Sequence, residues 1–161
     1  MKRRVLSTVS LVMVLCLLFC GTLNAEESGL RQVDGSFLTQ QDEARGSTRE
    51  SLQRGVHLMD GDSMISKAGV GKIYAYTQTT ASHDVDKLGV VTYVDQYNEE
   101  TEKWDQIDAW PTEAYNTYYV VSGKLLEVDG GYYYRVRAIH MVEKGDEYES
   151  TGSFTDGIMV E

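Results

Sequence analysis

The chain has 161 residues, of which 15 are basic and 25 are acidic, giving a net charge of −10. An acidic chain does not suit nucleic acid or an anionic membrane surface as a partner, because both attract positive charge. The length is enough for a single domain with its own core.

The first 25 residues have the pattern of a secretory signal. Lys2 to Arg4 precede an apolar run from Val5 to Cys20, and a short stretch ending in Ala25 precedes acidic residues. A positive start, a short apolar segment and a small residue before a polar sequence define an export signal. We predict cleavage after Ala25 and a secreted, extracellular protein with no membrane attachment. An uncleaved anchor and a lipoprotein beginning at Cys20 are the alternatives.

Cleavage after Ala25 would change the composition of the chain. Both cysteines, Cys16 and Cys20, lie in the signal, together with three basic and no acidic residues. The remainder has 12 basic and 25 acidic residues, a net charge of −13. It has no disulfide and no thiol nucleophile.

Residues 26–54 are polar, with few large apolar side chains and no sustained period. Such a segment buries too little apolar surface to offset the entropy of ordering it. We therefore predict a flexible polar leader, with a short helix over residues 42–53, and a single folded domain over residues 55–161.

From residue 56 onward, short runs alternate between apolar and polar residues, which is the period of a β-strand. Seven or eight strands at regular spacing predict an all-β fold, an antiparallel β-sandwich of the immunoglobulin-like kind. We expect Pro111 to end one strand and Asp129–Gly131 to form a hairpin turn. The predicted strands are residues 70–79, 88–94, 104–110, 118–121, 125–128, 132–142 and 148–160.

Aromatic residues suggest a candidate binding surface. Trp104 and Trp110 have the same parity, so an unbroken strand places both on one exposed side, with Ile107 and Ala109 facing the core. Exposed tryptophan is typical of sugar or protein contact. The alternative is a β-bulge near Asp108 that turns one tryptophan inward.

A second candidate surface lies on the strand over residues 132–142. Tyr133, Arg135 and Arg137 share one face, opposite Tyr134 and Val136. This face could take an acidic ligand. The competing interpretation is that both arginines pair with carboxylates on a neighbouring strand.

Two pairs of loop carboxylates, Asp60 with Asp62 and Asp84 with Asp86, are candidate Ca²⁺ ligands. The full helix–loop–helix calcium signature is absent, so ordinary turn residues are the alternative. No zinc ligand spacing links His57, His83 and His140, and we expect His140 to be packed and hydrogen-bonded. No cofactor other than Ca²⁺ is expected.

Gly61–Met64 is similar to the nucleophile block of GDS-type esterases. That chemistry needs a serine beside a histidine that is oriented by a carboxylate. The esterase class places an aspartate three residues before its histidine, and none of the three histidines has one. The sequence therefore favours a turn here rather than a catalytic site.

Two family resemblances follow from these residues. The run Tyr132–His140, with its Gly-containing turn and Ser/Thr-rich last strand, resembles the end of a fibronectin type III domain, which implies a corner role for Tyr134. The chain from about residue 55 to 160 resembles a family of small secreted proteins from Gram-positive, clostridia-like bacteria, a domain of unknown function. That resemblance implies an exported β domain and no activity. It rests on Asp60–Ser63, Val85–Lys87, Trp104, Trp110, Gly131–Val136, His140, Glu149, Ser150 and Thr155–Ile158.

Taken together, the sequence favours a secreted, non-enzymatic binding module for an extracellular glycan or protein. A secreted structural or surface-associated protein without a defined ligand is the first alternative. A small hydrolase is the second, and a pocket where a histidine, a hydroxyl and a carboxylate converge would favour it.

Overall fold

The computed structural model describes residues 30–48 and 55–161. The predicted signal peptide lies outside these residues. The described ranges contain nine β-strands: β1 (Gln32–Val33), β2 (Ser36–Thr39), β3 (Glu43–Ser47), β4 (Leu58–Gly69), β5 (Lys72–Asn98), β6 (Lys103–Glu127), β7 (Tyr132–Lys144), β8 (Glu147–Phe154) and β9 (Gly157–Val160).

The predicted all-β fold is confirmed, but the strands form one mixed sheet. Its order is β1-β2-β9-β7-β5-β4-β3, with β6 beside β5 and β8 beside β7. The pair β2–β9 is parallel, so the prediction of a purely antiparallel fold is wrong there. The strands are also connected in a single sheet, whereas an immunoglobulin-like sandwich has two separate sheets.

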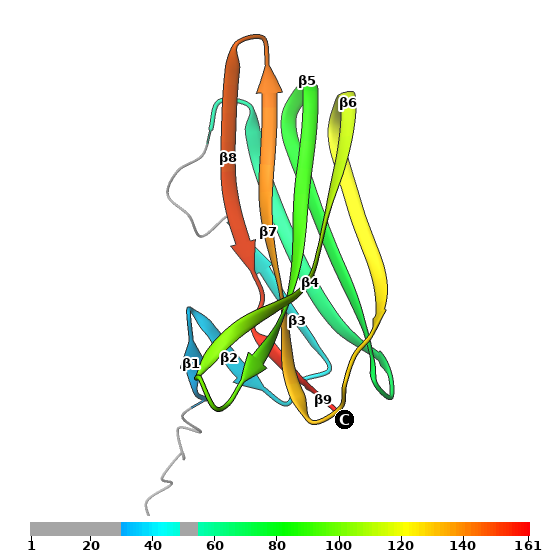
Figure 1. Cartoon of the computed structure of the whole chain (residues 1–161). Helices are drawn as coiled ribbons and strands as arrows, with labels where there is room; N and C mark the ends of the chain where they lie inside the picture. The colour runs from blue at the N-terminus through cyan, green and yellow to red at the C-terminus, as the bar shows by residue number, and fades with distance from the viewer. Residues whose placement is uncertain (1–29, 49–54) are drawn as a thin grey trace, which may run out of the picture.

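The sheet folds over because the long ribbon of β5 and β6 bends (Figure 1). The first part of β5 pairs with β4 and its later part pairs with β7, while β6 follows both parts. The register with β6 breaks between Thr80 and Val85, where the ribbon turns. The two halves then face each other, and the hydroxyls of Thr77 and Thr92 come within 2.7 Å.

The core lies between the facing halves and has a polar middle layer. One apolar cluster contains Ile65, Ile73, Val94, Tyr134 and Val136, among others. A second cluster, nearer the bend, is formed by Leu58, Ala81, Val85, Leu88, Val120 and Val142. Buried hydroxyls and His140 fall between the two clusters along β4, β5 and β7. This polar layer is fully hydrogen-bonded, as a buried polar group requires.

Strand β6 continues through Pro111, contrary to the prediction that this residue ends a strand. Pro111 is paired with Val91 of β5, and β6 has no other neighbour among the described strands. Proline lacks a backbone N–H, so it is tolerated on an edge strand whose outer side makes no ladder bonds.

The predicted flexible leader is wrong for residues 32–47, because these form β1, β2 and β3. Strand β3 pairs with β4, and β2 pairs with β9. The predicted helix over residues 42–53 is wrong for Glu43–Ser47, which form a strand, and its residues 49–53 lie outside the described residues. Hydrogen bonds attach this polar segment: Ser36 Oγ donates to Thr155 O at 2.7 Å, and Thr39 Oγ1 donates to Gly157 O at 3.2 Å. The domain therefore begins well before residue 55.

Tyr134 occupies the corner position that the fibronectin resemblance implied. Its ring is buried, and its hydroxyl donates to Asp129 O at 2.8 Å. The turn at Asp129–Gly131 is not a hairpin, because β6 and β7 both pair with β5 and not with each other. Within residues 30–48 and 55–161, no helix is long and apolar enough to cross a membrane.

Candidate binding face

One half of the folded-over sheet contains β3 and β4. On this half, the outer surface of β4, β5 and β6 exposes tyrosine and aliphatic side chains to solvent. Tyr119 is 42% exposed and Leu125 is 57% exposed. An exposed apolar patch on a sheet usually marks a contact surface. We call this surface the tyrosine face and define it as Asp62, Tyr74, Tyr76, Gln78, Tyr119, Val121 and Leu125.

Strand alternation produces the tyrosine face. Ile73, Ala75 and Thr77 are buried, so Tyr74, Tyr76 and Gln78 point outward from the same strand. Gly123 of β6 lies opposite Tyr76. A Cβ at Gly123 would lie 2.3 Å from the Tyr74 hydroxyl, so the absent side chain makes room for that tyrosine.

A directional hydrogen-bond network orders the polar groups of this face. Tyr76 Oη and Tyr119 Oη both donate to Gln78 Oε1, at 2.9 and 3.2 Å. The Gln78 amide then donates to Asp62 Oδ2 at 2.6 Å. Burial and the hydrogen bond with Tyr119 raise the pKa of Tyr76 to about 12. The Tyr76 hydroxyl therefore stays a protonated donor, and the oxygens of both tyrosines have lone pairs that can accept a hydrogen bond.

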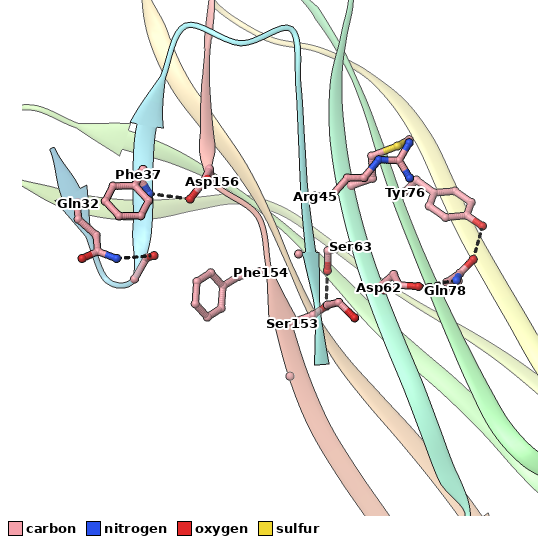
Figure 2. A pocket seen from close by; sticks show the side chains of 15 residues that line it. Gln32, Phe37, Arg45, Asp62, Ser63, Tyr76, Gln78, Ser153, Phe154 and Asp156 are labelled. Atoms are coloured by element: carbon pink, nitrogen blue, oxygen red, sulfur yellow. Dashed lines mark hydrogen bonds between the residues drawn. The ribbon is translucent and has the colours of Figure 1, made fainter. Parts of the chain in front are cut away.

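The tyrosine face continues into a cleft of about 890 Å³. Asp62, Tyr76 and Gln78 form one side of this cleft, and two phenylalanines, Phe37 of β2 and Phe154 of β8, line the other (Figure 2). Both phenylalanines are at least 40% exposed. The surface therefore combines flat aromatic rings with amide and carboxylate groups.

The comparison with known families can now be added. A family model described as a family of unknown function, DUF6147, matches residues 24–157. The chain belongs to DUF6147. This confirms the predicted membership of a domain-of-unknown-function family, and it extends that family's residues over the strands β1–β3. No curated protein and no solved structure matches the chain.

The two tryptophans of this DUF6147 protein lie on opposite faces of the sheet, so their predicted common face is wrong. Val94 pairs with Asp108 and Asp95 pairs with Gln106, which leaves Ile107 as a bulge. The bulge reverses the parity of β6 between the two rings. Ile107 is 44% exposed, although the sequence placed it in the core.

Both tryptophans are held by contacts within the fold. Trp104 Nε1 donates to Val33 O at 3.0 Å, and its ring lies over Gly157. Trp110 turns toward the core, as the bulge alternative expected, and its Nε1 donates to Ser122 Oγ at 2.8 Å.

The candidate residues of β7, Tyr133, Arg135 and Arg137, also form hydrogen bonds within the fold. Arg135 Nε donates to Asp95 Oδ2 at 3.0 Å, and Arg137 donates to both oxygens of the same carboxylate. This confirms the interpretation that the arginines pair with a carboxylate on a neighbouring strand. Burial lowers the pKa of Arg135, and the hydrogen bond to Asp95 raises the pKa of Arg137. Tyr133 Oη accepts from Gln40 Nε2 at 2.9 Å.

The structure does not bring the four candidate Ca²⁺ ligands into one cluster. Asp60 is buried and accepts from Ser47, Thr48 and the Gly61 N–H. Asp62 belongs to the tyrosine face. In the described ranges, no group of three or more histidine, cysteine, aspartate or glutamate residues is placed to hold a metal.

Asp84 and Asp86 lie at the other end of the molecule, in and after the bend of β5. Asp84 is exposed. Asp86 accepts from Lys144 Nζ and from the Gly145 N–H, both at 2.8 Å. These two donors lower the pKa of Asp86, with the backbone N–H the larger cause.

A serine and a histidine do meet in the polar layer of the core. His140 Nε2 lies 2.8 Å from Ser153 Oγ, which contacts Ser63 Oγ, and both serines line the cleft. The other ring nitrogen faces the Thr79 hydroxyl at 2.8 Å, the position where a hydrolase has a carboxylate. Burial lowers the pKa of His140 to about 4, so the ring is neutral and a weak base.

The sequence reasoning missed the tyrosine face, although its signal was present. Placing Ile73, Ala75 and Thr77 inside already implied that Tyr74, Tyr76 and Gln78 lie outside. Alternation could not predict that Tyr119, Val121 and Leu125 join this face. Their position depends on the pairing of β6 with a part of β5 that lies about 40 residues earlier in the chain.

Proposed function

We propose that this DUF6147 protein is an exported, non-enzymatic binding module that takes a glycan chain on the tyrosine face and the adjoining cleft. The observation that supports this most is the Tyr76–Gln78–Tyr119 network beside Asp62, in which Tyr119 is exposed and the other groups are half-buried. Sugars offer flat C–H faces that pack on aromatic rings, and hydroxyls that pair with amide and carboxylate groups. The tyrosine face provides both kinds of contact.

The charge of the surroundings favours a neutral glycan. The cleft is lined by Asp62 and Asp156, and its one arginine, Arg45, is bound to Glu43 at 2.7 Å. The predicted mature chain has a net charge of −13. Repulsion from these carboxylates would disfavour an anionic polymer.

We also propose that the folded-over sheet serves as an immunoglobulin-like sandwich would, with a rigid core that presents its outer surface to a partner. Export, a Gram-positive bacterial source and an extracellular site of action complete the proposal. They are supported by the signal-like N-terminus and by the resemblance described above.

The proposal is tested by affinity electrophoresis of the exported chain through gels that contain neutral cell-wall or plant polysaccharides. Tyr119→Ala and Gln78→Ala should weaken binding to a retarding polysaccharide about tenfold each, which corresponds to 1.4 kcal/mol. Tyr115→Ala is the matched control, because Tyr115 is an exposed tyrosine on β6 beyond the bend.

Two results would overturn the proposal. One is retardation of the wild type that Tyr119→Ala and Gln78→Ala leave unchanged. The other is the absence of retardation by any neutral polysaccharide, combined with capture of a protein on the same face. That second outcome would favour a protein-binding module.

A further inference from the structure

Two histidines that are 26 residues apart in the sequence meet at the bend of β5. His57 immediately precedes β4, and His83 lies in the bend itself. The Ser82 N–H donates to His57 O at 2.9 Å, and Leu58 pairs with Ala81. These backbone contacts hold the two imidazoles together.

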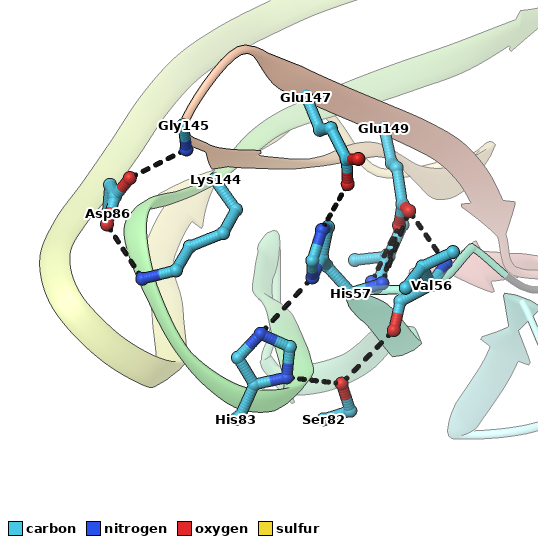
Figure 3. Close-up of polar contacts among 10 residues, drawn as sticks. Val56, His57, Ser82, His83, Asp86, Lys144, Gly145, Glu147 and Glu149 are labelled. Atoms are coloured by element: carbon cyan, nitrogen blue, oxygen red, sulfur yellow. Dashed lines mark hydrogen bonds and ion pairs between the residues drawn. The ribbon is translucent and has the colours of Figure 1, made fainter.

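The ring nitrogens are arranged in a chain (Figure 3). His57 Nδ1 lies 3.2 Å from His83 Nε2. On the outer sides, His57 Nε2 lies 2.5 Å from Glu147 Oε2, and His83 Nδ1 lies 2.9 Å from Ser82 Oγ. Each imidazole therefore has one nitrogen facing the other ring and one nitrogen bound to an oxygen.

We propose that His57 Nδ1 and His83 Nε2 bind one divalent transition metal ion of the Zn²⁺ class. With metal–nitrogen bonds of about 2.1 Å, two nitrogens 3.2 Å apart subtend about 100° at the metal, between octahedral and tetrahedral angles. The same arrangement puts the ring centroids about 5 Å apart. The observed centroid separation is 5.0 Å.

The outer contacts are those that metal-binding histidines use. A carboxylate on the far nitrogen of a ligating imidazole fixes its tautomer and makes it a better ligand. Glu147 occupies that position for His57, and it accepts the Nε2 proton so that Nδ1 presents its lone pair. The side chain of His57 is only 12% exposed, so this orientation is maintained by the fold.

Ser82 allows His83 to change tautomer when the metal binds. Without metal, the Ser82 hydroxyl can donate to His83 Nδ1 at 2.9 Å or to Val56 O at 3.3 Å, and His83 Nε2–H can donate to His57 Nδ1. With metal, the His83 proton moves to Nδ1 and the Ser82 oxygen accepts it. The Ser82 hydroxyl then turns to Val56 O, 3.3 Å away. The Ser82 hydroxyl can therefore pair with either tautomer of His83.

The nearby carboxylates do not complete the coordination. Glu149 accepts from the backbone N–H groups of residues 56, 57 and 58, and Asp86 is bound by Lys144 and Gly145. No third histidine, cysteine, aspartate or glutamate of the described ranges is placed for the metal. The ion would have two protein ligands and water in its other positions. Imidazole ligands select Zn²⁺, Cu²⁺ or Ni²⁺ over Ca²⁺.

The test is a Zn²⁺ titration of the exported chain without a histidine tag, followed by isothermal calorimetry and by ¹⁵N spectra of the imidazoles. One Zn²⁺ should bind per chain, and His83 should convert to the form protonated at Nδ1. His57→Gln and His83→Gln should each weaken binding at least tenfold, and Glu147→Gln should weaken it about tenfold. Ca²⁺ should not compete.

Asp84→Asn is the matched control, since Asp84 is an exposed carboxylate next to His83. It should leave the affinity for Zn²⁺ unchanged. Circular dichroism of each variant shows that the sheet is intact. His83 is exposed, so His83→Gln should fold as the wild type does. The proposal is overturned if the wild type takes up no Zn²⁺, or if both glutamine variants bind it as well as the wild type.

Discussion

At the residue scale, Asp95 is a buried carboxylate on which two arginines depend. It is 1% exposed and binds the guanidinium groups of both Arg135 and Arg137. Arg135 is itself buried and stacks on Trp104, with its guanidinium carbon 4.5 Å from the ring centroid. One carboxylate therefore pairs with two cations, and Arg135 also links β7 to the β1–β2 hairpin.

We expect Asp95→Ala to lower the free energy of unfolding by about 3–5 kcal/mol, because it leaves the buried Arg135 guanidinium without a counter-charge. Glu127→Ala is the control, since Glu127 forms an exposed ion pair with Lys72 and its loss should cost less than about 1 kcal/mol. Urea unfolding at neutral pH measures both. Equal losses in the two variants would contradict this account of Asp95.

His140 gives a prediction about pH. Burial lowers its pKa from 6.5 to about 4 in the folded chain, so the unfolded chain binds the proton first as the pH falls. Stability is complete above pH 6.5 and declines between pH 6.5 and about 4, by about 3 kcal/mol for this group. His140→Gln should remove that part of the decline. Unfolding midpoints in urea at pH 7, 5.5 and 4.5 test this, and parallel declines in the two proteins would refute it.

At the scale of elements, alternation predicted the strands well wherever one face is buried. The inward sets on residues 70–79, 88–94 and 132–142 are buried as expected, including Val90 and Val136. Alternation could not predict the bulge at Ile107, because a single inserted residue changes which side chains face inward without leaving a mark in the sequence. The candidate Trp104 and Trp110 surface was wrong for this reason.

The strands β1–β3 were missed for a different physical reason. Their buried residues are mostly small or polar, such as Ser36, Thr39 and Ala44. Hydrogen bonds to Arg135, Thr155 and Gly157 attach the segment. A prediction based on apolar side chains does not detect a segment that hydrogen bonds hold against the sheet.

A truncation tests the role of this N-terminal segment. A chain that begins at Gly55 lacks β3, which pairs with β4, and β2, which pairs with β9. Arg135 also loses its hydrogen bonds to Ser36 Oγ and Asp34 O. We expect it to be less stable than a chain beginning at Glu26 by at least about 3 kcal/mol, the sum of several lost buried hydrogen bonds. Thermal unfolding compares the two chains. Equal melting temperatures would restore the prediction of a flexible leader.

At the scale of the whole molecule, the two proposed binding sites and the core occupy different parts of the folded-over sheet. The tyrosine face and its cleft lie on the outer surface, and the His57–His83 pair lies at the bend of β5. His140 lies in the core between the halves, and Asp95 lies on the other face of β5, beside Arg135 and the β1–β2 hairpin; hydrogen bonds hold both side chains in place. The exposed groups can therefore bind a partner without rearrangement of the core.

The export prediction also concerns the whole molecule, because it sets which residues the functional protein contains. Cleavage after Ala25 lies ahead of Gln32, where β1 begins, so the mature chain keeps all nine described strands and has no cysteine. We expect intact-mass spectrometry of protein collected from the culture medium to give a chain that begins at Glu26. Signal peptidases favour a small residue before the cut, and Ala25 is the last small residue before the acidic segment. A mass that corresponds to a start at Cys20 with added acyl chains would instead identify a lipoprotein. A full-length mass in the membrane fraction would identify an uncleaved anchor, and either result would place the tyrosine face and the histidine pair at the cell surface rather than in the medium.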